Sequence, residues 1–302
     1  GAEVVKIERP KSGDDTRAWG PPWMKTDTGE SSGEASYYQS TNRGKLSVAI
    51  DMATPEGQEL VRALAASSDV LIENYKAGSL ARYGLDYATL AEINPRLVYC
   101  SITGFGQTGP RAEEPGYDFI IQGIGGLMSI TGERDDLPGG GPQKVGVAFS
   151  DLMTGLYSTV AIQAALLSRE RTGVGQYIDM ALLDVQVATL ANQSMNYLAS
   201  GKVPQRYGNA HANIVPYQVF RASDQDFVIA CGNDSQFVGL CEAIGLTDLP
   251  LDPRFARNAD RVTNREAVIE ILAQHFLGAT ADEWVRRIHP QGVPIGVINS
   301  IA

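Results

Sequence analysis

Asp151 is the residue whose place in the sequence first suggests catalysis. It follows a strand-like run, Val145–Phe149, and opens an amphipathic stretch that predicts a helix as far as Ser168. A carboxylate in the first turn of a helix lies near unpaired backbone N–H groups and the positive end of the helix dipole, which favour its ionised form. An ionised carboxylate can act as a nucleophile. Helix capping explains the same position and is the commoner role for a lone aspartate.

Glycine residues surround this candidate. Gly155 lies one turn after Asp151 on the same helix face, where the missing Cβ would let a ligand or another backbone approach. The run Gly104–Gly109 follows a predicted strand and matches the dinucleotide-binding pattern G-x-G-x-x-G. However, Pro110 comes next and Pro115 soon after, so no helix opens there to receive a pyrophosphate. The pattern therefore does not predict a nicotinamide site.

Composition excludes several classes of protein. The 302 residues are 43% hydrophobic and 20% charged, which is typical of a globular chain, and the net charge of −10 argues against nucleic acid and anionic membranes as partners. No apolar run is long enough to predict a membrane span, and no leader peptide is recognisable, so we expect a cytoplasmic protein. The scattered cysteine and histidine residues, three of each, predict neither disulfides nor a metal site.

The order of predicted elements indicates an α/β fold. Strand-like and helical segments alternate in the first half, which predicts a Rossmann-like parallel sheet in a large domain of residues 1–215. Residues 216–302 read as a smaller α+β domain. The predicted strands are residues 4–8, 46–50, 69–73, 97–102, 177–180, 227–231 and 293–298, and the clearest helices are 55–66, 80–83, 87–93, 235–244, 265–277 and 281–288.

Basic residues cluster near the start of this acidic chain. Lys6, Arg9, Lys11 and Arg17 surround the first predicted strand and the loop after it. Open α/β sheets bind ligands at the carboxyl ends of their strands. The cluster is therefore either a solvated loop or a site for an anionic nucleotide.

The motifs around Asp151 resemble those of the family III CoA transferases, the formyl-CoA and carnitine-CoA transferase type. The resemblance rests on Val145–Asp151 with Gly155, on Arg171–Gln176, and on the loop from Gly104 to Pro110, and it spans nearly the whole chain. In that family the aspartate at the place of Asp151 is the nucleophile. The family architecture is an interlocked homodimer with further segments at both ends, so the resemblance implies that both termini of this sequence are truncated.

Further matches imply where coenzyme A would bind. Residues at the places of Arg9 and Arg82 meet phosphate in the family, and those at Asn74 and Tyr75 flank the pantetheine and adenine. Ala77 stands where the family commonly has proline, which would loosen this turn slightly. Without the resemblance, a turn residue at Asn74 and a solvated charge at Arg82 would be the simpler interpretations.

Tyr117 and Asp118 bear on which reaction takes place. The resemblance places both in the substrate site, although Asp118 could equally be a capping or sheet-edge aspartate. An α-methylacyl-CoA racemase has the same fold and is the nearest alternative, but it carries a histidine base where this chain has Tyr117. Because a phenol is a poor base at neutral pH, the sequence favours the transferase. A non-catalytic acyl-CoA-binding protein is the remaining alternative.

The implied reaction moves CoA from an acyl-CoA thioester to a free carboxylic acid through an aspartyl anhydride and an aspartyl-CoA thioester. It needs no permanently bound cofactor and no metal. The glycine-rich loops at 104–109 and 123–126 would exclude water from the anhydride. A dicarboxylate such as succinate is a plausible acid, because Arg43, Arg206 and His211 could meet its distal carboxylate. Sequence alone does not identify the donor and acceptor.

Overall fold

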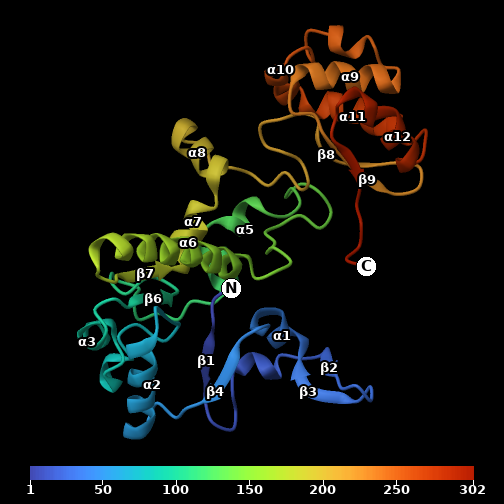
Figure 1. The fold of residues 1–302 in the computed structure, drawn as a ribbon. Helices are drawn as coiled ribbons and strands as arrows, with labels where there is room; N and C mark the ends of the chain where they lie inside the picture. Colours follow the sequence, from blue (N-terminus) through green and yellow to red (C-terminus); the bar gives the residue numbers. More distant parts are fainter. The chain divides into compact units, whose positions relative to one another are not determined.

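The computed structural model describes residues 1–302 and shows a mixed α/β fold with parallel sheets (Figure 1). The chain forms two compact units. The first unit consists of residues 1–125 and 146–189, and the second of residues 126–145 and 190–302. These units are groups of residues in mutual contact, so the predicted domain boundary between residues 215 and 216 stays a prediction. None of the helices has the length and apolar character that crossing a membrane requires.

A parallel sheet of three strands organises the first unit. Its order is β5 (Val70–Glu73), β6 (Val98–Thr103) and β7 (Tyr177–Ala181), with Glu73 beside Ser101 and Ser101 beside Asp179. The central strand, β6, is buried almost throughout, as expected for a parallel strand covered on both faces. The long helix α6 (Phe149–Thr172) packs against β6 and β7.

A second parallel pair, β1 (Val5–Glu8) with β4 (Leu46–Ala49), completes the parallel strands of this unit. The sequence predicts one Rossmann-like sheet, whereas the hydrogen-bonded strands form two groups. Both groups share one hydrophobic core, in which Ile7 and Val48 pack with Val61, Leu97 and Tyr99. The apolar pattern of the sequence therefore indicates which strands share a core. It does not indicate which strands are hydrogen-bonded to each other.

The five predicted strands of the first unit are confirmed, with ends that differ by one residue. The predicted strand at Val145–Phe149 is wrong. Residues 145–148 are irregular, and α6 already begins at Phe149 with Ala148 as its N-cap. A short apolar run is compatible with a strand or with the start of a helix, and tertiary contacts decide between them. Asp151 nevertheless lies in the first turn of α6, as predicted.

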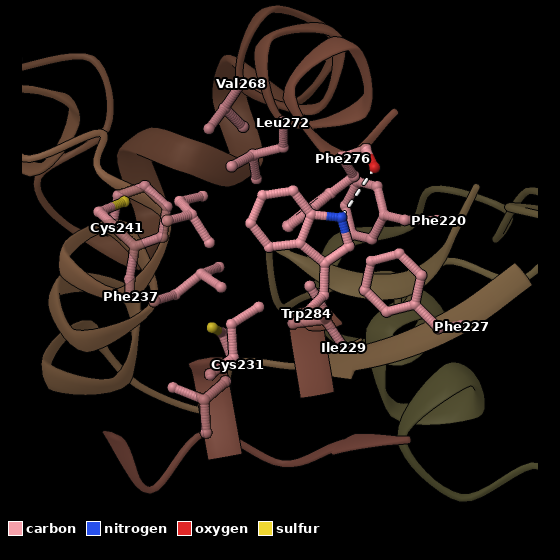
Figure 2. Packing of buried hydrophobic residues seen from close by; sticks show 14 of the residues in the cluster. Phe220, Phe227, Ile229, Cys231, Phe237, Cys241, Val268, Leu272, Phe276 and Trp284 are labelled. Carbon is pink, nitrogen blue, oxygen red and sulfur yellow. Dashed lines mark hydrogen bonds between the residues drawn. The ribbon is translucent and has the colours of Figure 1, made fainter. Parts of the chain in front are cut away.

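The second unit contains an antiparallel sheet in the order β10 (Ile295–Val297), β9 (Asp226–Ala230) and β8 (Tyr217–Arg221). Helices α9 (Asp234–Ile244), α11 (Arg265–Phe276) and α12 (Ala281–Ile288) supply the rest of its hydrophobic core. Figure 2 shows this core, in which the indole Nε1–H of Trp284 donates a 2.8 Å hydrogen bond to the carbonyl of Phe276.

The remaining elements are short. They are η1 (Asp15–Ala18), the hairpin β2 (Trp23–Lys25) and β3 (Ser31–Ala35), α1 (Ser36–Asn42), α2 (Pro55–Ser67), η2 (Ala81–Tyr83), α3 (Tyr87–Ile93), α4 (Asp118–Ile124), α5 (Leu127–Ile130), α7 (Leu182–Ala188), α8 (Ala191–Ser200), η3 (Leu249–Leu251), α10 (Asn258–Thr263) and η4 (His289–Gln291). Strands β2, β3 and β8 were not predicted. Two of them form an exposed hairpin without the alternating apolar pattern of a core strand.

Candidate active site

Asp151 extends from the first turn of α6, and its side chain is exposed in this chain. Its carboxylate forms no hydrogen bond and no ion pair. Ala148, and not Asp151, is the N-cap residue of the helix. Capping therefore does not explain Asp151. The space beside Gly155 is open, since a Cβ placed there would have no atom within 4 Å.

Asp118, the first residue of α4, performs the capping function that Asp151 does not. Its Oδ1 accepts a 2.8 Å hydrogen bond from the backbone N–H of Ser150, and its Oδ2 accepts one of 2.8 Å from the side-chain amide of Gln122. A carboxylate that receives an otherwise unpaired amide at a helix N-terminus stabilises the helix. The structural interpretation of Asp118 is therefore supported, and its contact with substrate stays a prediction.

The surroundings of Asp151 raise the pKa of its carboxyl group. Although the residue as a whole is exposed, its carboxyl group is partly surrounded by protein atoms, and this partial burial and, second, the negative charge of Asp118 raise its pKa from 3.8 to about 6. The helix N-terminus was expected to favour the ionised form, but burial and the neighbouring carboxylate outweigh it. At pH 7 about nine tenths of the groups are still ionised. A carboxylate with a raised pKa is also a stronger nucleophile than an ordinary aspartate.

A buried polar layer supports this end of α6. The Ser150 hydroxyl donates a 2.6 Å hydrogen bond to Oε1 of Gln186 in α7, and the Gln186 amide donates to Oγ1 of Thr189 at 3.1 Å. Gln122, Ser150 and Gln186 are fully buried. Because buried polar groups need partners, these bonds hold α4, α6 and α7 in one arrangement. The sequence analysis missed this layer, although a glutamine within the apolar run of residues 182–188 was a signal for it.

The glycine loop after β6 lies against the segment that leads to Asp118. A Cβ on Gly104 would lie 2.5 Å from the Cα of Gly116, so only glycine permits this approach of two backbones. Gly106 and Gly109 have φ angles of +87° and +97°, in the region that favours glycine. No helix opens directly after Gly109, which agrees with the exclusion of a dinucleotide site. The loop and the segment that leads to Asp118 are therefore packed directly against each other.

Three of the residues predicted to bind the nucleotide end of CoA follow the carboxyl ends of strands, and the fourth, Arg82, lies in η2. Arg9 follows β1 and forms an exposed ion pair with Asp15. Asn74 follows β5 and donates a 2.6 Å hydrogen bond from Nδ2 to the carbonyl of Ile102. The pKa of Tyr75 is raised by burial, and the positive charge of Arg9 acts against this rise. The guanidinium of Arg82 lies 4.6 Å from the ring centre of Tyr83.

Two of the basic residues near the start of the chain are already paired. Arg17 forms two 2.8 Å hydrogen bonds with the buried carboxylate of Glu8, which hold the pKa of Glu8 well below its usual range. Lys6 pairs with Asp14 and donates to Asn42 at 2.8 Å. The predicted basic cluster is therefore mainly a set of ion pairs in the first unit. Arg9, which pairs with the exposed Asp15, and Lys11 are the members that remain accessible, Arg9 with 61% of its side chain exposed.

Tyr117, directly before Asp118, is 70% exposed. The three residues suggested for a distal carboxylate lie as follows. Arg43 is exposed at the end of α1. Arg206 is already bound to Asp135 and, at 3.1 Å, to the carbonyl of Ser129. Burial and the charge of Arg265 lower the pKa of His211, which therefore offers no positive charge at neutral pH.

Two cavities of the chain do not include Asp151 in their linings. One, of about 550 Å³, lies in the second unit among Tyr207, Arg265 and their neighbours. The other, of about 190 Å³, lies in the first unit and is lined by Glu73, Lys76 and Gln107 with a group of tyrosines. Asp151 is instead an exposed residue of this chain. A closed active site requires a further surface to cover it.

Comparison with known proteins agrees with this site. Residues 1–302 match the description "CoA-transferase family III". A succinate–glutarate CoA-transferase from Agrobacterium fabrum is 52% identical over 301 residues, which cover 100% of this chain and 74% of that protein. The human succinyl-CoA:glutarate CoA-transferase is 43% identical over 301 residues, covering 100% of this chain and 66% of that protein.

A solved structure is similar over the whole chain. The crystal structure of a CAIB/BAIF family protein from Brucella suis has a TM-score of 0.84 and 54% sequence identity, covering 100% of this chain and 78% of that one. The chain spans about two thirds to three quarters of the length of the curated relatives that it matches. The chain therefore belongs to CoA-transferase family III, and the prediction of an enzyme that transfers CoA from an acyl-CoA thioester to a carboxylic acid is confirmed.

Proposed function

We propose that this protein transfers CoA between dicarboxylic acids, with succinyl-CoA and glutarate as a donor and acceptor pair, and that Asp151 is the nucleophile. The relatives named above support the choice of acids. The observation that carries the role of Asp151 is its free carboxylate at the start of α6, with a pKa of about 6 and no structural partner.

The chemistry follows from this carboxylate. An Asp151 oxygen attacks the thioester carbonyl, the carbon–sulfur bond breaks, and CoA leaves as a thiolate from a mixed anhydride. The thiolate then attacks the Asp151 carbonyl and releases the donor acid as a carboxylate, which leaves an aspartyl-CoA thioester. The acceptor carboxylate attacks this thioester, and the released thiolate attacks the acceptor's carbonyl carbon in the new anhydride. Asp151 returns as a carboxylate, and no net proton transfer is needed.

The nucleotide end of CoA would lie at the strand ends of the first unit. We assign its phosphates to Arg9 and Arg82 and its adenine and pantetheine to Asn74 and Tyr75. The accessible guanidinium of Arg9 and the effect of its charge on the pKa of Tyr75 support this assignment. A guanidinium binds phosphate through charge-assisted hydrogen bonds.

Tyr117 and Asp118 favour transfer over racemisation. A racemase needs two acid–base groups on opposite faces of the α-carbon. Asp118 already accepts two hydrogen bonds, and Tyr117 is an exposed phenol, which is a poor base at neutral pH. Both residues would instead line the substrate site next to Asp151.

A homodimer would supply the covering surface that Asp151 lacks here. Helix α6 exposes an apolar stripe, defined by Leu152, Leu156, Val160 and Leu167, whose side chains are 52%, 61%, 67% and 71% exposed. Contiguous apolar surface of this kind usually marks an interface. We propose an interlocked homodimer in which a second copy covers this stripe. The three free and buried cysteines suit a reducing compartment, and the cytoplasm is the proposed location.

The deciding experiment incubates the protein with succinyl-CoA and glutarate and follows glutaryl-CoA by mass spectrometry. Malonate, oxalate and acetate in place of glutarate would map the acceptor. With donor alone, the intact protein should gain a CoA adduct on the peptide that contains Asp151. Rapid α-deuteration of a 2-methylacyl-CoA in D₂O without CoA exchange would instead establish the racemase.

A further inference from the structure

The glycine loop from Gly104 to Gly109 is held by a side chain from another strand. The backbone N–H of Gln107 donates to both carboxylate oxygens of Asp179, at 2.9 and 3.2 Å. Asp179 lies in β7, beside Ser101 of β6. The neighbouring amide, that of Gly106, donates at 2.9 Å to the hydroxyl of Thr103. The loop is thus fixed at two successive amides.

The same loop is connected to the segment predicted to bind CoA. The Gln107 side-chain amide donates a 2.6 Å hydrogen bond to the Ser101 hydroxyl, which donates in turn to Oε1 of Glu73. The other oxygen of Glu73 accepts the backbone N–H of Tyr75 at 2.8 Å. Hydrogen bonds therefore run from Asp179 through Gln107 and Ser101 to Tyr75, across the ends of all three strands of the sheet.

No other structural role of Asp179 is evident in the fold. Its side chain is exposed and forms no ion pair, so its charge does not stabilise the core. A glycine-rich loop has many accessible conformations, and a charge-assisted bond to a backbone amide restricts them. The geometry points to Asp179 as a positioning residue, which holds the glycine loop over the reacting thioester through the amide of Gln107.

This inference rests on the proposed function, and it makes that function more specific. The amides of Gly106 and Gln107 are occupied, so they do not stabilise the oxyanion, and their task is to keep the loop closed. A loosened loop would admit water to the anhydride and to the aspartyl-CoA thioester. Loss of Asp179 should therefore change the ratio of hydrolysis to transfer, which a purely structural residue would leave unchanged.

The test compares D179A and D179N with D184A as the matched control. Asp184 is also exposed, in the first turn of α7, and forms no hydrogen bond. We expect D179A to lower kcat for transfer about 10- to 100-fold, as misplaced active-site groups do. The KM for succinyl-CoA should change less than about threefold, and the hydrolysed fraction of donor should rise. D179N should recover most of the transfer, because its side-chain oxygen still accepts a hydrogen bond.

Hydrogen exchange of the peptide covering residues 104–116 gives a readout that is independent of turnover. Exchange should be faster in D179A than in wild type, and close to wild type in D179N and D184A. Wild-type exchange together with a wild-type hydrolysis-to-transfer ratio in D179A would overturn the inference and leave the transferase intact. A wild-type protein that moves CoA to no acid would overturn the proposed function and this inference with it.

Discussion

The core of the second unit is closed by aromatic side chains, whereas the helix that carries Asp151 buries polar side chains and exposes apolar ones. Phe220, Phe227, Phe276 and Trp284 pack edge to face in the second unit (Figure 2). The buried residues of α6 include Ser150, Thr154, Ser158 and Arg169. The aromatic core of the second unit is complete within one chain. Exposed apolar side chains such as those of α6 usually mark a surface that another surface covers. The second unit therefore completes its own core, whereas α6 leaves apolar side chains uncovered.

The largest expected effect is on chemistry. Asp151→Asn should lower CoA exchange by about three orders of magnitude or more, because a covalent nucleophile is removed. Ionising Asp151 costs the folded state free energy above pH 6, since its pKa is raised from 3.8 to about 6, so the variant should be no less stable than wild type. Asp184→Asn, at the start of α7, is the control and should be fully active. More than about a tenth of wild-type turnover in the Asp151 variant would exclude the nucleophile role.

Substitutions in the core of the second unit should have the largest effect on the free energy of unfolding. Phe276 is fully buried against Phe220, Phe227 and Trp284, so Phe276→Ala should lower the free energy of unfolding by about 3–5 kcal/mol. Leu251→Ala, at a side chain 78% exposed, should change it by less than about 0.5 kcal/mol. Urea denaturation followed by tryptophan fluorescence measures both. Equal effects of the two variants would contradict the assignment of the core.

A charged substitution in the apolar stripe of α6 should weaken dimer formation. Leu156→Glu places a charge in the proposed interface and should raise the dimer dissociation constant at least about 100-fold. Light scattering across a dilution series measures this, with Leu251→Glu as a control on an exposed site outside the stripe. A wild-type protein that stays monomeric, or a Leu156→Glu variant that dimerises normally, would show that something other than a second copy covers the stripe.

Removal of the charge at Arg9 should weaken CoA binding moderately. A phosphate contact of an exposed arginine contributes about 1.5 kcal/mol, or roughly a tenfold change in Kd. Calorimetry with CoA and with dephospho-CoA would show whether the 3′-phosphate is the group involved. Lys202→Ala, at an exposed residue of the second unit, is the control. An unchanged Kd for both ligands in Arg9→Ala would place the nucleotide elsewhere.

The smallest effect concerns pH. Activity should fall as the pH drops through about 6, because Asp151 becomes protonated and loses its nucleophilic form. Asp118→Asn removes the second cause of the raised pKa while its side-chain oxygen can still accept the Ser150 N–H. The acidic limb of the kcat profile should then move to lower pH by less than about one unit, since burial is the larger cause. A shift to higher pH would contradict the role of Asp118.

Local patterns in the sequence were sufficient to predict many of the helices and strands. The apolar periodicity of residues 55–66 and 265–277 and the strand-like runs at 69–73 and 97–102 reflect contacts with a core, and the structure places elements there. Val145–Phe149 failed because a short apolar run does not distinguish a strand from a helix start. The hairpin of β2 and β3 is exposed except at the end of β3, so it lacks the alternating pattern that predicts a strand.

The sequence by itself determined where Asp151 lies, in the first turn of a helix, and which family the chain belongs to, because both depend on residues close together along the chain. Only the tertiary structure decided that Asp118 caps α6, that Arg17 neutralises Glu8, and that Asp179 holds Gln107. Each of these pairs joins separate segments. Electrostatic interactions act through space and depend on burial, so the pKa of Asp151 and the partners of each charge follow from the folded arrangement and cannot be read from the spacing of residues.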